Sequence, residues 1–140
     1  MRGCQQSVLV DDCQAHAGVA FTDSVLEGQF ATEYTNGGPV KVQNSVIRAN
    51  AYKDIVMDLH GSGTVIVTGC TIDTAGGKNA AAWAVKINTD RSAFTGNTFT
   101  GKYTKHIYVD QSSLGAVLTG NAVTSGKLTV EDVSSGDCFY

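Results

Sequence analysis

The sequence is poor in helix-forming residues and poor in charge. Leu and Glu are scarce, charged residues make up only 16%, and Pro39 is the only proline. A helical bundle or a coiled coil is therefore not expected, because both need many strong helix formers. Hydrophobic residues make up 42%, which excludes a disordered chain. A length of 140 residues fits one domain or one stack of repeats.

A net positive charge and long apolar runs are also missing. The formal net charge is −3, and the isoelectric point near 5.4 indicates no basic surface for nucleic acid. No apolar run is long enough to cross a membrane. The apolar stretch 7–10 is too short for a secretory signal. We expect neither nucleic acid nor a membrane as partner. The location stays open, with a virion or the cell exterior favoured.

Common metal-binding and nucleophile motifs are absent from the sequence. Cys4, Cys13, Cys70 and Cys138 show no CxxC spacing, so we expect no zinc site. Buried thiols are the favoured interpretation, and disulfides are the alternative. There is no GxSxG, P-loop or HExxH pattern. The sequence therefore gives no support to a serine hydrolase, a nucleotide-binding protein or a zinc protease.

What the sequence has instead is a repeat rich in Val, Thr and Gly. Two apolar residues in alternation, a turn-former, a small polar residue and another apolar residue recur at 40–47, 65–72, 92–99 and 116–123. These copies start 25, 27 and 24 residues apart. Two further copies, at 8–15 and 19–26, start only 11 residues apart, so one of them could be a different strand of the same turn. Such spacing indicates stacked repeats.

Each position of the repeat has a physical role. The apolar positions would point inward. The turn-former column tolerates a positive φ, so the chain can bend there without a loop. The small polar column can bond to the backbone and to its equivalents one layer away. The inward columns are Val42, Val67, Phe94 and Leu118, then Ile47, Ile72, Phe99 and Val123; the turn-formers are Asn44, Gly69, Gly96 and Gly120; the small polar residues are Ser45, Cys70, Asn97 and Asn121.

A second strand follows each bend at a variable distance, at 55–58, 85–88, 107–110 and 128–131. A coil of parallel strands, in which like residues stack on like, accounts for this order. The pattern resembles the right-handed parallel β-helix of pectate lyases, polygalacturonases and bacteriophage tailspikes, which carry an asparagine-ladder turn. The resemblance implies an all-β solenoid of about five to six coils. A β-sandwich is the alternative.

The predicted organisation is a single β-helix domain over residues 1–140. Irregular or capping coils are expected at 1–39, regular coils at 40–133, and a C-terminal cap or interface at 134–140. Because the ends of an open stack need covering, we expect a homo-oligomer. The tailspike resemblance implies a trimer.

Polar residues follow the second strand of each coil. The layer alignment places Asp58, Asn88, Asp110 and Glu131 in one column, and His60, Asp90, Ser112 and Val133 two residues further on. With layers about 4.8 Å apart, the polar members would form one patch. Carboxylates this close cannot all ionise freely, so the pKa of one of them rises. Acid–base work at a glycosidic bond requires such a raised pKa. We predict that Asp58, Asp90 and Asp110 are catalytic and that His60 and Asn88 bind substrate.

The same column has other interpretations. Carboxylates two layers apart would suit an inverting hydrolase, and adjacent ones a retaining hydrolase. They could hold Ca²⁺, as in lyases that act on acidic sugars; no other cofactor or metal is expected. They could also simply solvate strand ends and feed turns.

Aromatic residues are a second indication of sugar binding. Trp83 precedes a second strand, and Tyr108 alternates with two inward residues and should face outward. We predict that both bind substrate, because rings stack on sugars. The alternatives are that Trp83 covers the core and that Tyr108 makes a subunit contact. The strings at 88–90, 11–12 and 60–61 resemble polygalacturonase motifs, but their order differs, so the resemblance assigns them no role.

Three functions are compatible with these features. The first is a tailspike-like module that recognises, and in one version cleaves, a surface polysaccharide. The second is a polysaccharide lyase or glycoside hydrolase. The third is a structural or assembly protein without catalysis, because the β-helix hosts many activities.

Overall fold

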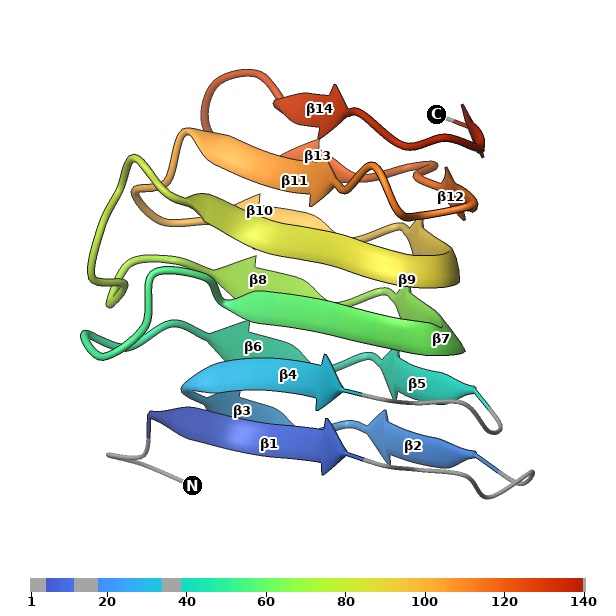
Figure 1. Cartoon of the computed structure of the whole chain (residues 1–140). Helices are drawn as coiled ribbons and strands as arrows, with labels where there is room; N and C mark the ends of the chain where they lie inside the picture. The colour runs from blue at the N-terminus through green and yellow to red at the C-terminus, as the bar shows by residue number, and fades with distance from the viewer. Residues whose placement is uncertain (1–4, 12–17, 34–38, 140) are drawn as a thin grey trace.

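A computed structural model of the chain describes residues 5–11, 18–33 and 39–139, the last three by their backbone alone. All regular elements among these residues are strands, and they stack in parallel as a β-solenoid of about five turns. This confirms the predicted all-β parallel β-helix over the β-sandwich. In Figure 1 the chain runs left to right along the front, returns across the back and rises toward the C-terminus, so the coil is right-handed.

Three parallel walls enclose the core, and the wall nearest the viewer in Figure 1 is called the front sheet here. In spatial order it contains β1 (Gln6–Asp11), β4 (Gln29–Glu33), the first part of β7 (Met57–Thr68), the first part of β9 (Trp83–Thr95), β11 (Lys105–Val109) and β14 (Val130–Asp132). β7 and β9 are the longest strands described, and the polar residues singled out by the sequence lie on them or directly after β11.

The other two walls complete each coil. The side sheet contains β2 (Val19–Thr22), β5 (Val40–Gln43), the last parts of β7 and β9, β12 (Gly115–Val117) and β15 (Asp137–Phe139). The back sheet contains β3 (Val25–Glu27), β6 (Val46–Arg48), β8 (Thr71–Asp73), β10 (Thr98–Thr100) and β13 (Ala122–Val123).

The sharp bend between the side sheet and the back sheet falls on the predicted column. The φ angles are 49° at Asn44, 64° at Gly69, 63° at Gly96 and 67° at Gly120. Asp23 takes the same place in the first coil, with a φ of 51°. The expectation that this column needs residues tolerant of positive φ is therefore confirmed, because each coil turns here through one left-handed residue.

The asparagine ladder behind the bend is also confirmed. The Oδ1 atom of Asn97 accepts from the Cys70 amide at 2.9 Å, and Nδ2 donates to the Val67 carbonyl at 3.0 Å and to Oδ1 of Asn121 at 3.0 Å. Asn121 in turn donates to the Phe94 carbonyl at 2.7 Å. These buried bonds satisfy backbone groups that the bend removes from the sheets, so they stabilise the coil-to-coil stacking.

The core is a stack of like residues, as the repeat predicts. The inward side chains are almost completely buried, with Leu118 the most exposed of the central ones at 4%. Val123 is only half-buried, since it lies in the last coil. Cys70 is a buried free thiol, whereas Cys4, Cys13 and the side chain of Cys138 lie outside the described residues.

Within the first 39 residues, the structure describes strands β1 to β4. The copy at 19–26 is a full repeat, because Val19 pairs with Val40 and Val25 pairs with Val46. The copy at 8–15 begins on β1, which is a front-sheet strand of the same coil. Asp23 replaces the glycine of later coils, which is why composition alone did not mark this coil as regular.

Candidate functional site

The predicted polar column forms two neighbouring columns in the structure. Asp58 pairs with Lys86 and not with Asn88, and Asn88 pairs with His60. Asp110 follows β11 in register with Asn88. The prediction that Asp58 shares a layer position with Asn88 and Asp110 was therefore wrong by two residues. Asn88 and Asp110 do share a layer position.

The error has a simple physical reason. A shift of two residues leaves the inward face of a strand unchanged, so alternation cannot fix the register. The inward residues of β7 on the front sheet are Met57 and Leu59, which pair with Val85 and Ile87. The alignment had used Ile55 as the first inward residue, but Ile55 lies before the strand.

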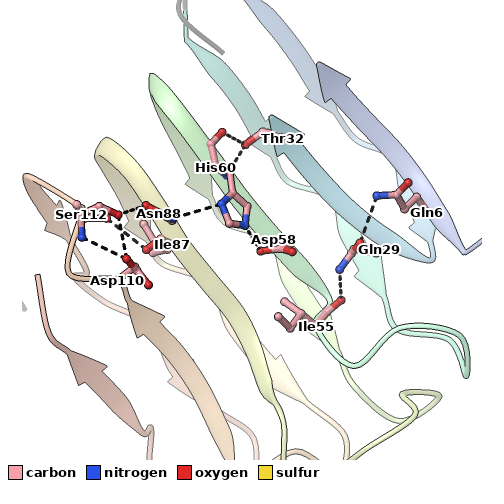
Figure 2. Close-up of polar contacts among 11 residues, drawn as sticks. Gln6, Gln29, Thr32, Ile55, Asp58, His60, Ile87, Asn88, Asp110 and Ser112 are labelled. Atoms are coloured by element: carbon pink, nitrogen blue, oxygen red, sulfur yellow. Dashed lines mark hydrogen bonds and ion pairs between the residues drawn. The ribbon is translucent and has the colours of Figure 1, made fainter. Parts of the chain in front are cut away.

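A continuous row of hydrogen bonds crosses the front sheet, and Figure 2 shows it. Nε2 of His60 lies 2.7 Å from Oδ1 of Asp58, and Nδ1 lies 3.3 Å from Nδ2 of Asn88. The Ser112 hydroxyl contacts Oδ1 of Asn88 and lies 2.9 Å from Oδ1 of Asp110. We call these five side chains the polar row. It connects β7, β9 and the turn after β11.

The backbone beneath the polar row is held by buried groups. The hydroxyl of Thr32, a buried residue of β4, donates to the His60 carbonyl at 2.9 Å and accepts from the His60 amide at 3.0 Å. The Asp110 amide donates to the Ile87 carbonyl at 2.8 Å, and the buried Ser113 hydroxyl donates to the same carbonyl at 3.2 Å. The row therefore rests on a rigid sheet, as a preorganised binding surface requires.

Asp110 is the member whose charge is best defined. Its partial burial would raise the pKa, but the backbone and side-chain hydrogen bonds from Ser112 and the positive charges of Lys86 and His60 outweigh it. The pKa of Asp110 is therefore below its ordinary value. The carboxylate is ionised at neutral pH and acts as an acceptor, which suits a binding residue or a base but not a general acid.

The remaining predicted carboxylates lie apart from the row. Asp90 is half-buried and lies two residues beyond Asn88 on β9, while the hydrogen bonds described above run through Ser112. Glu131 pairs with Tyr108 and is exposed on β14, in the column of Asp58. The structure therefore does not gather the acidic residues into one cluster.

Trp83 and Tyr108 come together beside the polar row. Their ring centres are 5.7 Å apart and their planes are tilted by 46°. Nζ of Lys105 lies 5.6 Å from the centre of the Trp83 ring, which is a cation–π arrangement. Both aromatic side chains are half-buried. Trp83 therefore neither fills the core nor stands free, and part of each ring faces the outside.

A shallow depression of about 370 Å³ opens at this aromatic pair, lined by Asp54, Ile55, Ala82, Trp83, Lys86 and Tyr108. Its rim from the preceding coil is fixed, because buried Gln29 donates through Nε2 to the Ile55 carbonyl at 3.0 Å (Figure 2). Lys86 lies in register with both Tyr108 and Asp58. The depression and the polar row are therefore adjacent on the front sheet.

Sequence reasoning did not single out Lys86, Lys105 or Ser112 as site residues. The sequence could have indicated Lys86 and Lys105, because Lys86 occupies an outward position on a second strand and Lys105 lies just before one. Ser112 was placed in a column, but its link between Asn88 and Asp110 depends on the turn after β11. Side-chain direction in a turn cannot be read from strand alternation.

The described residues offer no metal cluster, since in that part of the chain no three His, Cys, Asp or Glu side chains group as ligands. A Ca²⁺ ion prefers six or more oxygen ligands, which the polar row does not provide. Among the same residues, no helix is long and apolar enough to cross a membrane.

The chain was compared with family models, curated proteins and solved structures. No family model matches the chain, and neither a curated protein nor a solved structure is significantly similar to it.

Proposed function

We propose that the chain is a glycan-recognition module, tailspike-like in kind, that binds a surface polysaccharide along the front sheet. The observation that carries the proposal is the aromatic depression at Trp83 and Tyr108 with the polar row beside it. An apolar wall next to a few convergent polar groups is the usual composition of a small-molecule site.

The aromatic pair suits the apolar face of a sugar ring. Trp and Tyr present a large, rigid, partly polar surface, which can cover the apolar face of a ring. Lys86 and Asp54 at the same depression can bond to ring substituents. One or two sugar units fit the scale of this hollow, so we propose it as the anchoring subsite.

The polar row suits a ligand longer than one sugar. Its side chains come from β7, β9 and the turn after β11, so they are spread along the solenoid axis in steps of about 4.8 Å. Amide, hydroxyl and carboxylate groups in such a line can bond to successive hydroxyls. A polysaccharide that lies along the axis would contact the row and the depression together.

We favour recognition over cleavage. The corrected register separates Asp58 and Asp110 by two strands, about 9–10 Å, and by two residues along the sheet, about 6–7 Å more in that direction. Hydrolases place their carboxyl groups about 5–5.5 Å or about 6.5–9.5 Å apart. The low pKa of Asp110 also disfavours a role as general acid.

A glycan array combined with a reducing-end assay tests the proposal. We expect binding to at least one bacterial surface polysaccharide without release of reducing ends. Lys86→Ala should weaken the binding, whereas Lys41→Ala, an exposed lysine on β5 of the side sheet, should not. Absence of binding together with a stable oligomer that hides Tyr108 would instead support the assembly role.

A further inference from the structure

The polar row contains one more acceptor than its protons can serve. The Ser112 hydroxyl carries a single proton. It lies within hydrogen-bonding distance of two acceptor oxygens, Oδ1 of Asn88 and Oδ1 of Asp110. With the amide oxygen of Asn88 facing Ser112, the single proton can serve only one of these two contacts fully. The other then brings two lone pairs together.

The protonation state of His60 decides which orientation of the Asn88 amide pairs every donor with an acceptor. When the imidazole is neutral with its proton on Nε2, Nε2 donates to Asp58 and Nδ1 accepts from Nδ2 of Asn88. The amide oxygen of Asn88 then faces Ser112 and takes its proton. Asp110 keeps the Ser112 backbone N–H at 3.2 Å but loses the hydroxyl proton.

When His60 is protonated, both ring nitrogens are donors, and Nδ1 can no longer face an amide N–H. A half-turn of the Asn88 side-chain amide resolves the conflict, because its oxygen and nitrogen have nearly the same shape. Oδ1 of Asn88 then accepts from Nδ1, and Nδ2 donates to Ser112. The Ser112 hydroxyl is now free to donate to Asp110 at 2.9 Å. Each of these contacts pairs a donor with an acceptor.

We propose that the polar row is a proton-controlled switch, in which protonation of His60 reverses the Asn88 amide and moves the Ser112 proton from Asn88 to Asp110. No covalent bond changes: one proton enters at Nδ1 of His60, and the others are redirected. The hydrogen bonds made by the charged ring are the stronger kind, since one partner is ionised.

The charged groups around His60 come from every neighbouring element of the front sheet. Asp58 is on the same strand, Lys86 is on β9, and Asp110 follows β11. On the other side, Glu33 ends β4 and is exposed. A proton that enters the ring therefore does so among three carboxylates and one ammonium group.

The switch would change what the row offers to a ligand. With His60 neutral, Asp110 has acceptor capacity left for a sugar hydroxyl; with His60 charged, the Ser112 hydroxyl uses part of it. This consequence rests on the proposed glycan binding. We expect about fivefold tighter binding at about pH 8 than at about pH 5, the value of one hydrogen bond. The switch itself does not depend on a ligand.

Nuclear magnetic resonance on the ¹⁵N-labelled, ligand-free chain tests the switch directly. The N–H···N bond from Asn88 to His60 should transmit a scalar coupling between Nδ2 and Nδ1 at about pH 8, and the coupling should vanish at about pH 5. The Asn88 amide and the Ser112 backbone amide should titrate together with the imidazole. A coupling that is absent at both pH values, or Asn88 signals that stay constant while His60 titrates, overturns the proposal.

Two variants guard against misinterpretation. In His60→Gln the Asn88 amide signals should no longer change with pH, while the signals of Asn97 in the ladder report that the fold is intact. His106→Asn removes the other described histidine and should leave the transition at Asn88 unchanged. If the transition persists in His60→Gln, the proposal is wrong. Because these measurements need no glycan, they remain decisive if the proposed binding fails.

Discussion

Asn88 lies directly beside His60 on the neighbouring strand, with 3.3 Å between Nδ2 of the amide and Nδ1 of the ring. The other ring nitrogen is bonded to Asp58 at 2.7 Å. The histidine is therefore held between a carboxylate and an amide, and the polar residues at these strand ends form one connected unit. The glycan-binding proposal and the switch both depend on this connection.

Truncation of Tyr108 should weaken polysaccharide binding. Tyr108→Ala removes one wall of the depression and the 5.7 Å ring contact with Trp83. We expect a dissociation constant about tenfold higher, which corresponds to about 1.4 kcal/mol. Isothermal titration with the polysaccharide found on the array measures it. Tyr52→Ala is the matched control, because Tyr52 is 55% exposed and lies outside the depression; equal losses in both variants would contradict the assignment.

The asparagine ladder should contribute strongly to stability. Asn97→Ala leaves the Cys70 amide and the Val67 carbonyl without their side-chain partners in a buried place. We expect the free energy of unfolding to fall by about 3 kcal/mol, as for unsatisfied buried groups. Urea denaturation measures the change. Asn79→Ala, in an exposed turn, should cost no more than about 1 kcal/mol; a similar cost for both would show that the ladder is not special.

Replacement of Gly96 in the bend column should cost more stability with alanine than with asparagine. Its φ is 63°, and an added Cβ would meet nothing within 4 Å, so the cost of a side chain is conformational and not steric. We expect Gly96→Ala to lose about 1–2 kcal/mol of unfolding free energy. Gly96→Asn should lose less, since Asn44 holds the same bend at 49°. Thermal or urea unfolding of the two variants checks the order, and the reverse order would count against the account.

His106 should lower the free energy of unfolding in acid. The ring is 6% exposed, Nδ1 accepts from the Thr129 amide at 3.0 Å, and burial lowers the pKa. Because the folded pKa lies below the unfolded value near 6.5, the folded state binds fewer protons. Its contribution is complete above that value and is lost as the pH falls toward the folded pKa.

The measurement is unfolding free energy in urea at about pH 7.5 and about pH 5 for the wild type and for His106→Asn. Asparagine keeps an acceptor for Thr129 but does not titrate. We expect the wild type to lose more stability in acid than the variant. Equal losses would show that His106 does not stay neutral in the folded state.

Ser92 and Ser113 should respond oppositely to the same substitution. The buried Ser92 hydroxyl finds no hydrogen-bond partner among the described residues, whereas the buried Ser113 hydroxyl donates to Ile87. Ser92→Ala should raise the unfolding free energy by about 1 kcal/mol, because it removes an unsatisfied group. Ser113→Ala should lower it by a similar amount. Loss of stability in Ser92→Ala would indicate a partner for its hydroxyl.

The bends were the part of the fold that the sequence specified best. A left-handed residue is needed once per coil, and few residue types tolerate it. The glycines at 69, 96 and 120 and the asparagines behind two of them therefore indicated the solenoid. In the first coil Asp23 takes this place, and aspartate is too common in ordinary turns to stand out.

The register of the front sheet could not be obtained in the same way. Inward alternation is preserved by a two-residue shift, and the loops before these strands vary in length, so Ile55 and Met57 were equally good first residues. The site changed with that shift. Lys86, and not Asn88, lies beside Asp58, and Ser112 in the turn after β11 closes the row.

The most direct test of glycan recognition uses the only tryptophan of the chain, Trp83, as a reporter at the depression. Its fluorescence and its quenching by acrylamide are followed while a polysaccharide selected on the array is added. We expect a saturable spectral change with protection from acrylamide, lost in Lys86→Ala and kept in Lys41→Ala. Saturable binding that leaves Trp83 fully accessible to acrylamide, or no binding to any polysaccharide, would contradict the account.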